Sequence, residues 1–195
     1  MRELTADIFV SLDGFAADAD GGQSWTFGHF GPQFAEYAQH VLGQPQVMIM
    51  GRVTYELMAG VWPSSPDPLA AQMNSLPKLV FSTTLAEPLS WSNARLATRG
   101  LAEEIGALKQ QPGYPLRSIG SITLVRSMMA AGLVDRLRLV VFPHVLGHAG
   151  HQAVFAGYPE ASLELISATV LDSRLAVLEY QPPRTRPTRT PGTSR

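Results

Sequence analysis

One stretch of the sequence combines residue types that could bind a phosphate. Four apolar residues, Val47–Met50, predict a strand that is buried on both faces of a sheet. The strand breaks at Gly51, and Arg52 and Thr54 follow as helical spacing begins. A helix that starts there presents unpaired N–H groups, which favour an anion, while Arg52 adds a permanent cation and Thr54 a hydroxyl donor. The alternative is a plain strand–turn–helix in which Gly51 permits the turn and Arg52 is solvated.

Two other predicted strands end in residues of similar chemistry. Asp13 and Gly14 form a strong turn signal after the first strand, and Gly120 ends a later one. Ser121 can cap the helix that starts at Ile122. Because ligands of parallel sheets bind beyond the carboxyl ends of the strands, we expect these residues to lie close to the Gly51 turn. Asp13 could orient a substrate or relay a proton, and its alternative role is an Asx-turn.

The order of the predicted elements defines the fold class. Strands alternate with helices, and the chain closes with two strands around a turn at 172–173. The predicted strands cover residues 4–12, 47–50, 78–82, 95–98, 116–119, 137–142, 163–171 and 174–180. This order predicts an α/β three-layer sandwich with a mostly parallel central sheet and an antiparallel C-terminal hairpin. Residues 1–181 form a single predicted domain.

The composition is that of a globular protein with one sizeable core. The chain has 195 residues, of which 45% are hydrophobic and 16% charged. No run is long enough for a membrane span and the N-terminus lacks a signal peptide, so we expect a cytoplasmic protein without a membrane partner. The absence of cysteine excludes disulfides, thiolate metal sites and the cysteine-ligated zinc of nucleobase deaminases.

The charge is unevenly distributed. Residues 182–195 contain four of the 15 basic residues and no acid, and they are rich in Pro and Thr, so we expect a disordered tail. The rest of the chain holds 11 basic and 16 acidic residues. A body with this acidic balance is a poor nucleic-acid binder, and no nucleic-acid partner is expected.

Six segments together resemble a known family. They are Ser11-Leu12-Asp13-Gly14-Phe15-Ala16, Gly51-Arg52-x-Thr54-Tyr55-Glu56, Phe81-Ser82-Thr83-Thr84, Ile119-Gly120-Ser121, Gly132-Leu133-Val134-Asp135 and Phe142-Pro143-x-x-Leu146-Gly147-x-x-Gly150. In this order they resemble the dihydrofolate reductase-like family, which includes the reductase domain of the bifunctional riboflavin-biosynthesis protein. The resemblance runs from about residue 4 to residue 180.

The resemblance implies a pyridine-nucleotide reductase that binds NADPH, with NADH as the alternative. By resemblance, the cofactor-binding residues are Gly51, Arg52 and Thr54 at the phosphates, Ser82, Thr83 and Thr84 near the adenosine ribose, and Gly120, Ser121 and Ile122 at the pyrophosphate. The resemblance also places Asp13 and Gly14 at the nicotinamide and substrate end, with Trp25 in the loop that closes over it. Asp13 is the candidate catalytic residue.

Two features narrow the function. Typical dihydrofolate reductases carry an acid at the start of the first helix, whereas residues 25–35 contain none, so folate is not the expected substrate. His144, His148 and His151 would share one face of a helix as metal ligands. Pro143, Gly147 and Gly150 predict a loop instead, and no metal is expected.

The expected activity is hydride transfer from NADPH to a small heterocyclic or conjugated substrate. One alternative is the riboflavin-pathway reduction of a ribosylaminopyrimidine phosphate. The other is a protein that holds a nucleotide or drug without turnover. We also predict a homodimer formed by the 133–142 strand region and the terminal hairpin, because both faces of the 137–142 strand are apolar and need cover.

Overall fold

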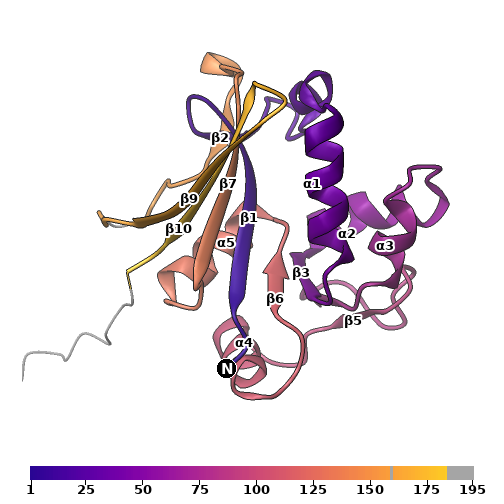
Figure 1. The fold of residues 1–195 in the computed structure, drawn as a ribbon. Helices are drawn as coiled ribbons and strands as arrows, with labels where there is room; N and C mark the ends of the chain where they lie inside the picture. The colour runs from indigo at the N-terminus through magenta and orange to yellow at the C-terminus, as the bar shows by residue number, and fades with distance from the viewer. Residues whose placement is uncertain (159, 184–195) are drawn as a thin grey trace, which may run out of the picture.

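An eight-stranded sheet forms the middle layer of the protein, which is described by a computed structural model for residues 1–158 and 160–183 (Figure 1). The strands are Leu4–Ser11 (β1), Val47–Gly51 (β3), Lys78–Phe81 (β4), Ala94–Leu96 (β5), Leu116–Ser118 (β6), Arg136–Phe142 (β7), Glu164–Leu171 (β9) and Leu175–Gln181 (β10). Their order is β5-β4-β3-β6-β1-β7-β10-β9. Neighbours from β5 to β7 are parallel, and β10 and β9 are antiparallel, as predicted.

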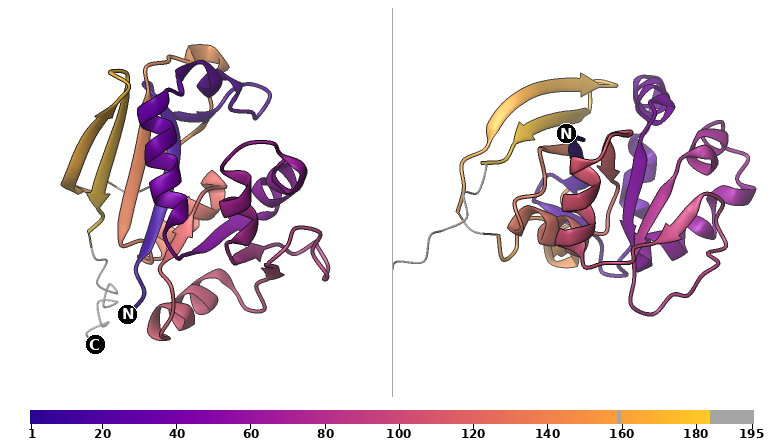
Figure 2. Two further views of the ribbon diagram at one scale, coloured as in Figure 1. Left: turned by 45° about the vertical axis from the view of Figure 1, so that its right-hand side comes forward. Right: turned by 90° about the horizontal axis from the view of Figure 1, so that it is seen from below.

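Helices cover both faces of this sheet (Figure 2). The helices are Pro32–Gly43 (α1), Arg52–Ala59 (α2), Ala70–Ser75 (α3), Leu101–Gln110 (α4) and Ile122–Ala130 (α5), with 3-10 turns at Ser24–His29 (η1), Trp62–Ser64 (η2) and Gly147–Ala149 (η3). Buried residues of α4 and α5 pack against Leu4, Ile8 and Ile49 on one face. Residues of α2 and α3 pack against Met48 and Met50 on the other.

The order in which the chain adds strands to the sheet reverses at β6. From β1 the chain moves outward through β3 and β4 to β5, then returns to place β6 between β3 and β1. β1 pairs with β6 only from Leu4 to Ala6, although its pairing with β7 continues to Ser11. Such a switch point, at the carboxyl ends of parallel strands, is where open α/β sheets bind ligands.

The C-terminal hairpin is attached to the first helix. Asp172 and Ser173 form the turn with positive φ angles of 53° and 54°. The Asp172 carboxylate accepts hydrogen bonds from the backbone N–H groups of Gln33 and Phe34, both 3.0 Å long. It therefore supplies the cap that α1 lacks locally, because Gly31 at the N-cap position has no side chain.

Two features of the structure were not predicted from the sequence, and a third corrects a prediction. β7 lies inside the sheet between β1 and β10, so the free edge on this side belongs to β9. A second, two-stranded sheet joins Phe15–Ala17 (β2) to His151–Ala153 (β8), two strands too short to give a periodic signal. Ser121 occupies the N-cap position of α5 without forming a cap hydrogen bond.

The predicted tail lies mostly outside the described residues, which end at 183. None of the helices formed by residues 1–158 and 160–183 is long and apolar enough to span a membrane.

Candidate cofactor and substrate site

A pocket of about 310 Å³ opens where β3 and β6 end. We call it the carboxyl-end pocket. It is lined by Gly51, Arg52, Val53, Phe81, Ser121, Thr123, Leu124 and Ser127. Three of them, Gly51, Arg52 and Ser121, were predicted from the sequence. Residues that are 70 positions apart along the chain thus line one space.

Two glycines bring the strand ends into close contact. A Cβ atom on Gly51 would lie 2.8 Å from the Ser121 hydroxyl, and one on Gly120 would lie 3.3 Å from the Thr54 hydroxyl. Gly120 also has a φ of 111°, a conformation that other residues rarely adopt, and the Gly120–Ser121 peptide bond is cis. The four predicted residues Gly51, Thr54, Gly120 and Ser121 therefore form one contiguous group.

Both helices that begin at this group lack a side-chain cap. Gly51 precedes α2 and Ser121 precedes α5, and neither makes a capping hydrogen bond. The Ser121 hydroxyl instead lies 3.2 Å from the Thr123 hydroxyl. The N–H groups of both first turns are consequently available to an anion, which the two helix dipoles also favour.

Arg52 is the single cation among the described residues that line this pocket. Its Nη1 lies 2.6 Å from Oε2 of Glu56, and both side chains are nearly half exposed. An exposed pair of this kind contributes little to stability, about 0–1 kcal/mol. A phosphate in the pocket would compete with Glu56 for the guanidinium.

The other predicted cofactor residues differ in which groups they can offer to a ligand. Ser82, Thr83 and Thr84 follow β4 at the same edge of the sheet, but the Ser82 hydroxyl accepts hydrogen bonds from the Thr84 and Leu85 N–H groups. The Ile122 side chain is 5% exposed and belongs to the core. Only the backbone of Ile122 can face a ligand.

Asp13 connects two loops at the carboxyl ends of β1 and β7. Its carboxylate accepts hydrogen bonds from the Ser11 hydroxyl at 2.6 Å and from the N–H groups of Leu146 and Gly147 at 3.2 and 2.7 Å. The Ser11 bond is the main reason that the pKa of Asp13 falls to about 2, with the two N–H donors also lowering the pKa. Asp13 is therefore ionised at neutral pH. Gly14, which follows it with a φ of 89°, makes the turn.

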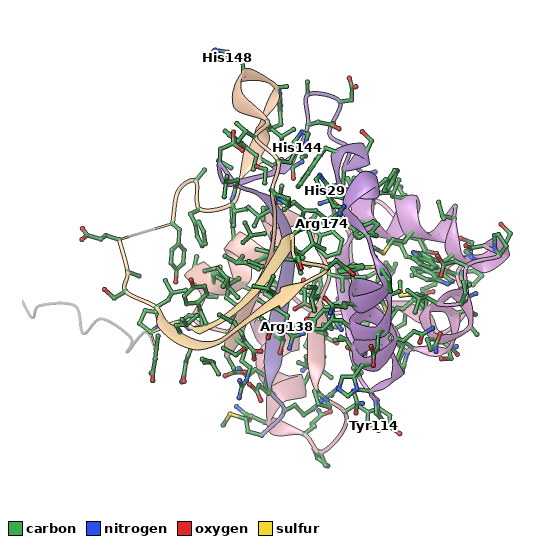
Figure 3. The ribbon with its side chains drawn as sticks, turned by 45° about the horizontal axis from the view of Figure 1, so that its top comes forward. His29, Tyr114, Arg138, His144, His148 and Arg174 are labelled. Carbon is green, nitrogen blue, oxygen red and sulfur yellow. The ribbon has the colours of Figure 1, made fainter. Side chains whose placement is uncertain are left out.

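A cluster of ring side chains lies at the same ends of β1 and β7. Trp25 stacks on His144 with ring centres 5.8 Å apart, and it meets Phe142 edge-on at 5.4 Å. The centre of the His29 ring lies 6.1 Å from that of His144 and 5.9 Å from that of Phe142. Figure 3 shows His29 and His144 at the end of the molecule opposite Tyr114. Trp25 is 9% exposed, and its Nε1 has no hydrogen-bond partner among the described residues.

The sequence reasoning did not find this ring cluster. His144 was considered only as a metal ligand, and His29 and Phe142 were given no role in the site. The ring residues come from η1 and from β7 with the loop after it, two pairs of residues more than 110 positions apart, so no local period relates one pair to the other. Only the Trp25 loop gave a signal, through the resemblance to a known family.

The three histidines of the predicted loop do not come together as a cluster of ligands. Residues 143–150 form a loop with the short η3 turn, as predicted, and His151 begins β8. Across residues 1–158 and 160–183, no three His, Asp or Glu side chains lie close enough to hold a metal ion.

Comparisons with known proteins identify the family of the chain. A profile of the RibD C-terminal domain matches residues 2–177. The chain belongs to this family. Membership supports a reductase-type function, that is, an oxidoreductase.

Individual relatives cover nearly the whole chain. The "Uncharacterized protein YyaP" of Bacillus subtilis (strain 168) is 30% identical over 184 residues, which are 92% of this chain and 94% of that protein. A "Putative riboflavin biosynthesis protein" from Shewanella sp. PV-4 superposes with a TM-score of 0.76 at 22% identity, over 93% of this chain and 99% of that one. Dihydrofolate reductase from Enterococcus faecalis, complexed with NADP(H), superposes with a TM-score of 0.61 at 15% identity, over 92% and 96%. The two structural matches establish a dihydrofolate reductase-like fold, as the sequence predicted.

Proposed function

We propose that the protein is an NADPH-dependent reductase that transfers a hydride to a small heterocyclic or conjugated substrate. The carboxyl-end pocket carries this proposal, because two uncapped helix starts and Arg52 converge there. Backbone N–H groups beside one guanidinium suit the phosphates of a dinucleotide. The E. faecalis enzyme, which has the same fold, binds NADP(H). NADH is the alternative cofactor.

The glycines of this pocket fit a phosphate group. Because Gly51 and Gly120 have no Cβ, the Ser121 and Thr54 hydroxyls can lie directly against the two strand ends, which gathers these donors at one place. The hydroxyl groups of Ser121, Thr123 and Ser127 add donors around the same space. We assign the pyrophosphate to Gly120, Ser121 and the Ile122 backbone, the phosphates beside α2 to Gly51, Arg52 and Thr54, and the adenosine ribose to the Ser82–Thr84 turn.

The substrate end of the site is assigned to the ring cluster and Asp13. The bound nicotinamide supplies the hydride, and the chain's residues orient the substrate and limit access of water. The partly exposed ring of His144, which stacks on the buried Trp25, suits a flat, conjugated molecule. We propose that Asp13, with Gly14, acts by holding the Leu146–Gly147 loop, because its carboxylate accepts hydrogen bonds from both N–H groups of that loop. The Ser11 hydroxyl is the third donor to the same carboxylate, which these bonds keep ionised. The proton that accompanies the hydride then comes from solvent or from His29 or His144.

Two alternatives keep specific support. The family match makes a ribosylaminopyrimidine phosphate a candidate substrate, and its phosphate would need a cation beyond Arg52. Arg174, which is exposed, lies at the same end of the molecule as His29 and His144 (Figure 3). The second alternative, a nucleotide or drug binder without turnover, shares the carboxyl-end pocket.

Calorimetric titration with NADPH, followed by a substrate screen for loss of nicotinamide absorbance, tests the proposal. We expect one NADPH per chain, and binding at least about tenfold weaker in Gly120→Ala, where the new Cβ strains a positive φ and crowds Thr54. Gly113→Ala is the matched control, since it also has a positive φ, 149°, but lies in the loop before β6. Absence of NADPH and NADH binding would refute the proposal, and binding without any turnover would favour the non-catalytic alternative.

We further propose that the protein is a homodimer joined through the β9–β10 hairpin alone, because the 137–142 strand of the interface predicted from the sequence lies inside the sheet and is mostly buried. β9 has a free edge, and Leu165, Ile166 and Val170 are 54%, 42% and 67% exposed. Exposed apolar strands at a sheet edge are normally covered. Sedimentation should give twice the mass of 21.1 kDa, and Val170→Arg should return the protein to the monomer mass. Val53→Arg, at an exposed helix position, is the control, and a wild-type monomer at micromolar concentration would exclude the dimer.

A further inference from the structure

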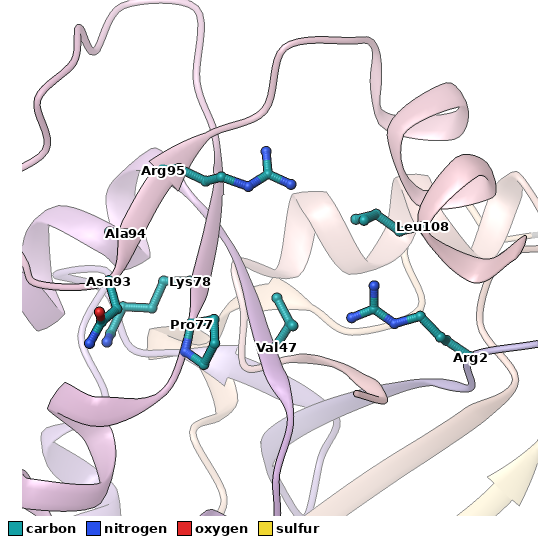
Figure 4. Close-up of a pocket in the computed structure, with 8 residues that line it drawn as sticks. All are labelled: Arg2, Val47, Pro77, Lys78, Asn93, Ala94, Arg95 and Leu108. Carbon is teal, nitrogen blue, oxygen red and sulfur yellow. The ribbon is translucent and has the colours of Figure 1, made fainter. Parts of the chain in front are cut away.

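A second pocket lies at the opposite end of the parallel strands, where β3, β4 and β5 begin (Figure 4). It has a volume of about 300 Å³. Its lining residues, which we call the amino-end pocket, are Arg2, Val47, Pro77, Lys78, Asn93, Ala94, Arg95 and Leu108. No residue of this pocket belongs to the proposed cofactor or substrate site.

The amino-end pocket carries an excess of positive charge. Three of its described lining residues, Arg2, Lys78 and Arg95, are cations, and none is an acid. This concentration contrasts with residues 1–181 as a whole, where acidic residues outnumber basic ones by 16 to 11 with the three pocket cations included. A pocket with this local charge in an acidic body would attract anions selectively.

Lys78 supplies a buried part of this charge, and burial lowers the pKa of its ammonium group to about 8. It is 1% exposed, and its ammonium group donates hydrogen bonds to the carbonyls of Asn74, Leu76 and Ser92 at 3.2, 2.7 and 3.1 Å. The Nζ also lies 4.3 Å from the centre of the Trp91 ring. Because these contacts occupy its donors, Lys78 acts on a ligand through its field and its aliphatic chain.

The two arginines are placed to contact a ligand directly. Arg2 and Arg95 extend their guanidinium groups toward the same space from opposite sides of the pocket (Figure 4). Arg2 donates through Nε to the Tyr114 carbonyl and has no carboxylate partner among the described residues. Arg95 lies 3.3 Å from Glu104, but Arg99 also holds that carboxylate at 2.9 Å. Arg95 can therefore turn to an anion without leaving the buried Glu104 unpaired.

The pocket also has an apolar floor. Val47, Pro77 and Leu108 supply it, and Figure 4 shows Val47 and Leu108 near the Arg2 side chain and Pro77 beside Lys78. Such a floor gains free energy by covering the apolar body of a ligand, which an inorganic ion lacks. Arginine forks bind carboxylate and phosphate groups with paired hydrogen bonds.

We propose that the amino-end pocket binds a small organic anion. Its carboxylate or phosphate group lies between Arg2 and Arg95, and its apolar body packs on Val47, Pro77 and Leu108. This site is separate from the cofactor site, because the two pockets lie at opposite ends of β3. The proposal therefore holds or fails independently of the reductase function.

Titration of the full chain with phenylphosphonate, followed by nuclear magnetic resonance of the backbone amides, tests the proposal. We expect saturable shifts at Arg2, Asn93 and Arg95, binding that weakens as salt is added, and no displacement by NADPH. Inorganic phosphate should bind more weakly because it has no apolar body. Benzyl alcohol should bind more weakly because it has no charge.

Variants assign the binding to the two arginines. Arg2→Gln and Arg95→Gln should each weaken phenylphosphonate binding by about tenfold, as expected for loss of a charge-assisted hydrogen bond. Arg99→Gln is the matched control, because it contacts the same Glu104 but lies outside the pocket, and it should change the affinity little. If Arg95→Gln fails to fold, Arg2→Gln decides alone, since Arg2 has no ion-pair partner to lose among the described residues.

Three outcomes would overturn the proposal. The first is absence of saturable shifts, and the second is unchanged affinity in Arg2→Gln. The third is a pattern of shifts confined to Gly51 and Ser121, which would mean that the probe occupies the carboxyl-end pocket.

Discussion

The two pockets of this protein lie at opposite ends of the same parallel strands, and they hold positive charge in different ways. The carboxyl-end pocket has glycines, hydroxyls and one arginine at two helix starts. The amino-end pocket has three cations and no hydroxyl side chain among its described lining residues. The first offers an anion mainly oriented backbone groups, whereas the second offers it charged side chains.

This difference has a consequence for stability. Arg52 in the carboxyl-end pocket is exposed and pairs only with Glu56, so removing it leaves no buried group unsatisfied. Lys78 in the amino-end pocket is buried and satisfies three carbonyls. One cation therefore belongs to the binding surface, and the other belongs to the core that supports β4.

The largest predicted effect comes from Lys78→Met. The substitution keeps the length of the side chain but leaves three carbonyl acceptors without their donor, which costs about 3 kcal/mol of the free energy of unfolding. Arg52→Ala should change the same free energy by less than about 1 kcal/mol. Urea unfolding of both variants measures the contrast. Equal stabilities would mean that Lys78 is not held by these carbonyls.

The two pockets also differ in how well they can be predicted from the sequence. The carboxyl-end pocket is built from turns that directly follow strands, so Gly51, Arg52 and Ser121 could be identified from neighbouring residues. The amino-end pocket gathers Arg2, Val47, Lys78, Arg95 and Leu108 from five separate segments, and no local pattern relates them. Side-chain chemistry that arises only from tertiary contacts leaves no periodic signal.

The fold itself was predictable for a similar reason. Alternating strands and helices gave the three layers and the hairpin, but the position of β7 inside the sheet depends on where β10 adds, which the sequence does not encode locally. The cap at Ser121 was predicted wrongly because its hydroxyl lies against Thr123 rather than an N–H group. Conversely, α1 is capped by Asp172, whose distance along the chain hides it from any local rule.

The next effect concerns the cofactor. Arg52→Ala should weaken NADPH binding roughly tenfold to a hundredfold, because a charge-assisted hydrogen bond to phosphate contributes about 1.5–3 kcal/mol. NADH, which lacks the extra phosphate, should lose less. Calorimetric titrations of both cofactors measure the difference. Equal losses would place Arg52 at the pyrophosphate, and no loss for either cofactor would remove Arg52 from the site.

Glu56→Gln provides the matched test of the same site. The variant frees Arg52 from its 2.6 Å ion pair, so NADPH should bind more tightly, by a few-fold at most for an exposed pair. Phenylphosphonate binding at the amino-end pocket should stay unchanged in both variants. A parallel change in the two affinities would mean that the pockets are not independent.

The smallest effect is expected at Asp13, which lines neither pocket. Asp13→Asn should leave NADPH and phenylphosphonate affinities unchanged and lower turnover once a substrate is identified, because the loop held at Leu146 and Gly147 loosens. The folded pKa of about 2 lies below the ordinary 3.8, so the carboxylate contributes stability above about pH 4 that is lost as the pH falls through 2. Acid unfolding of the variant should lack this part of the pH dependence. Normal turnover together with a lower melting temperature would restrict Asp13 to a purely structural role.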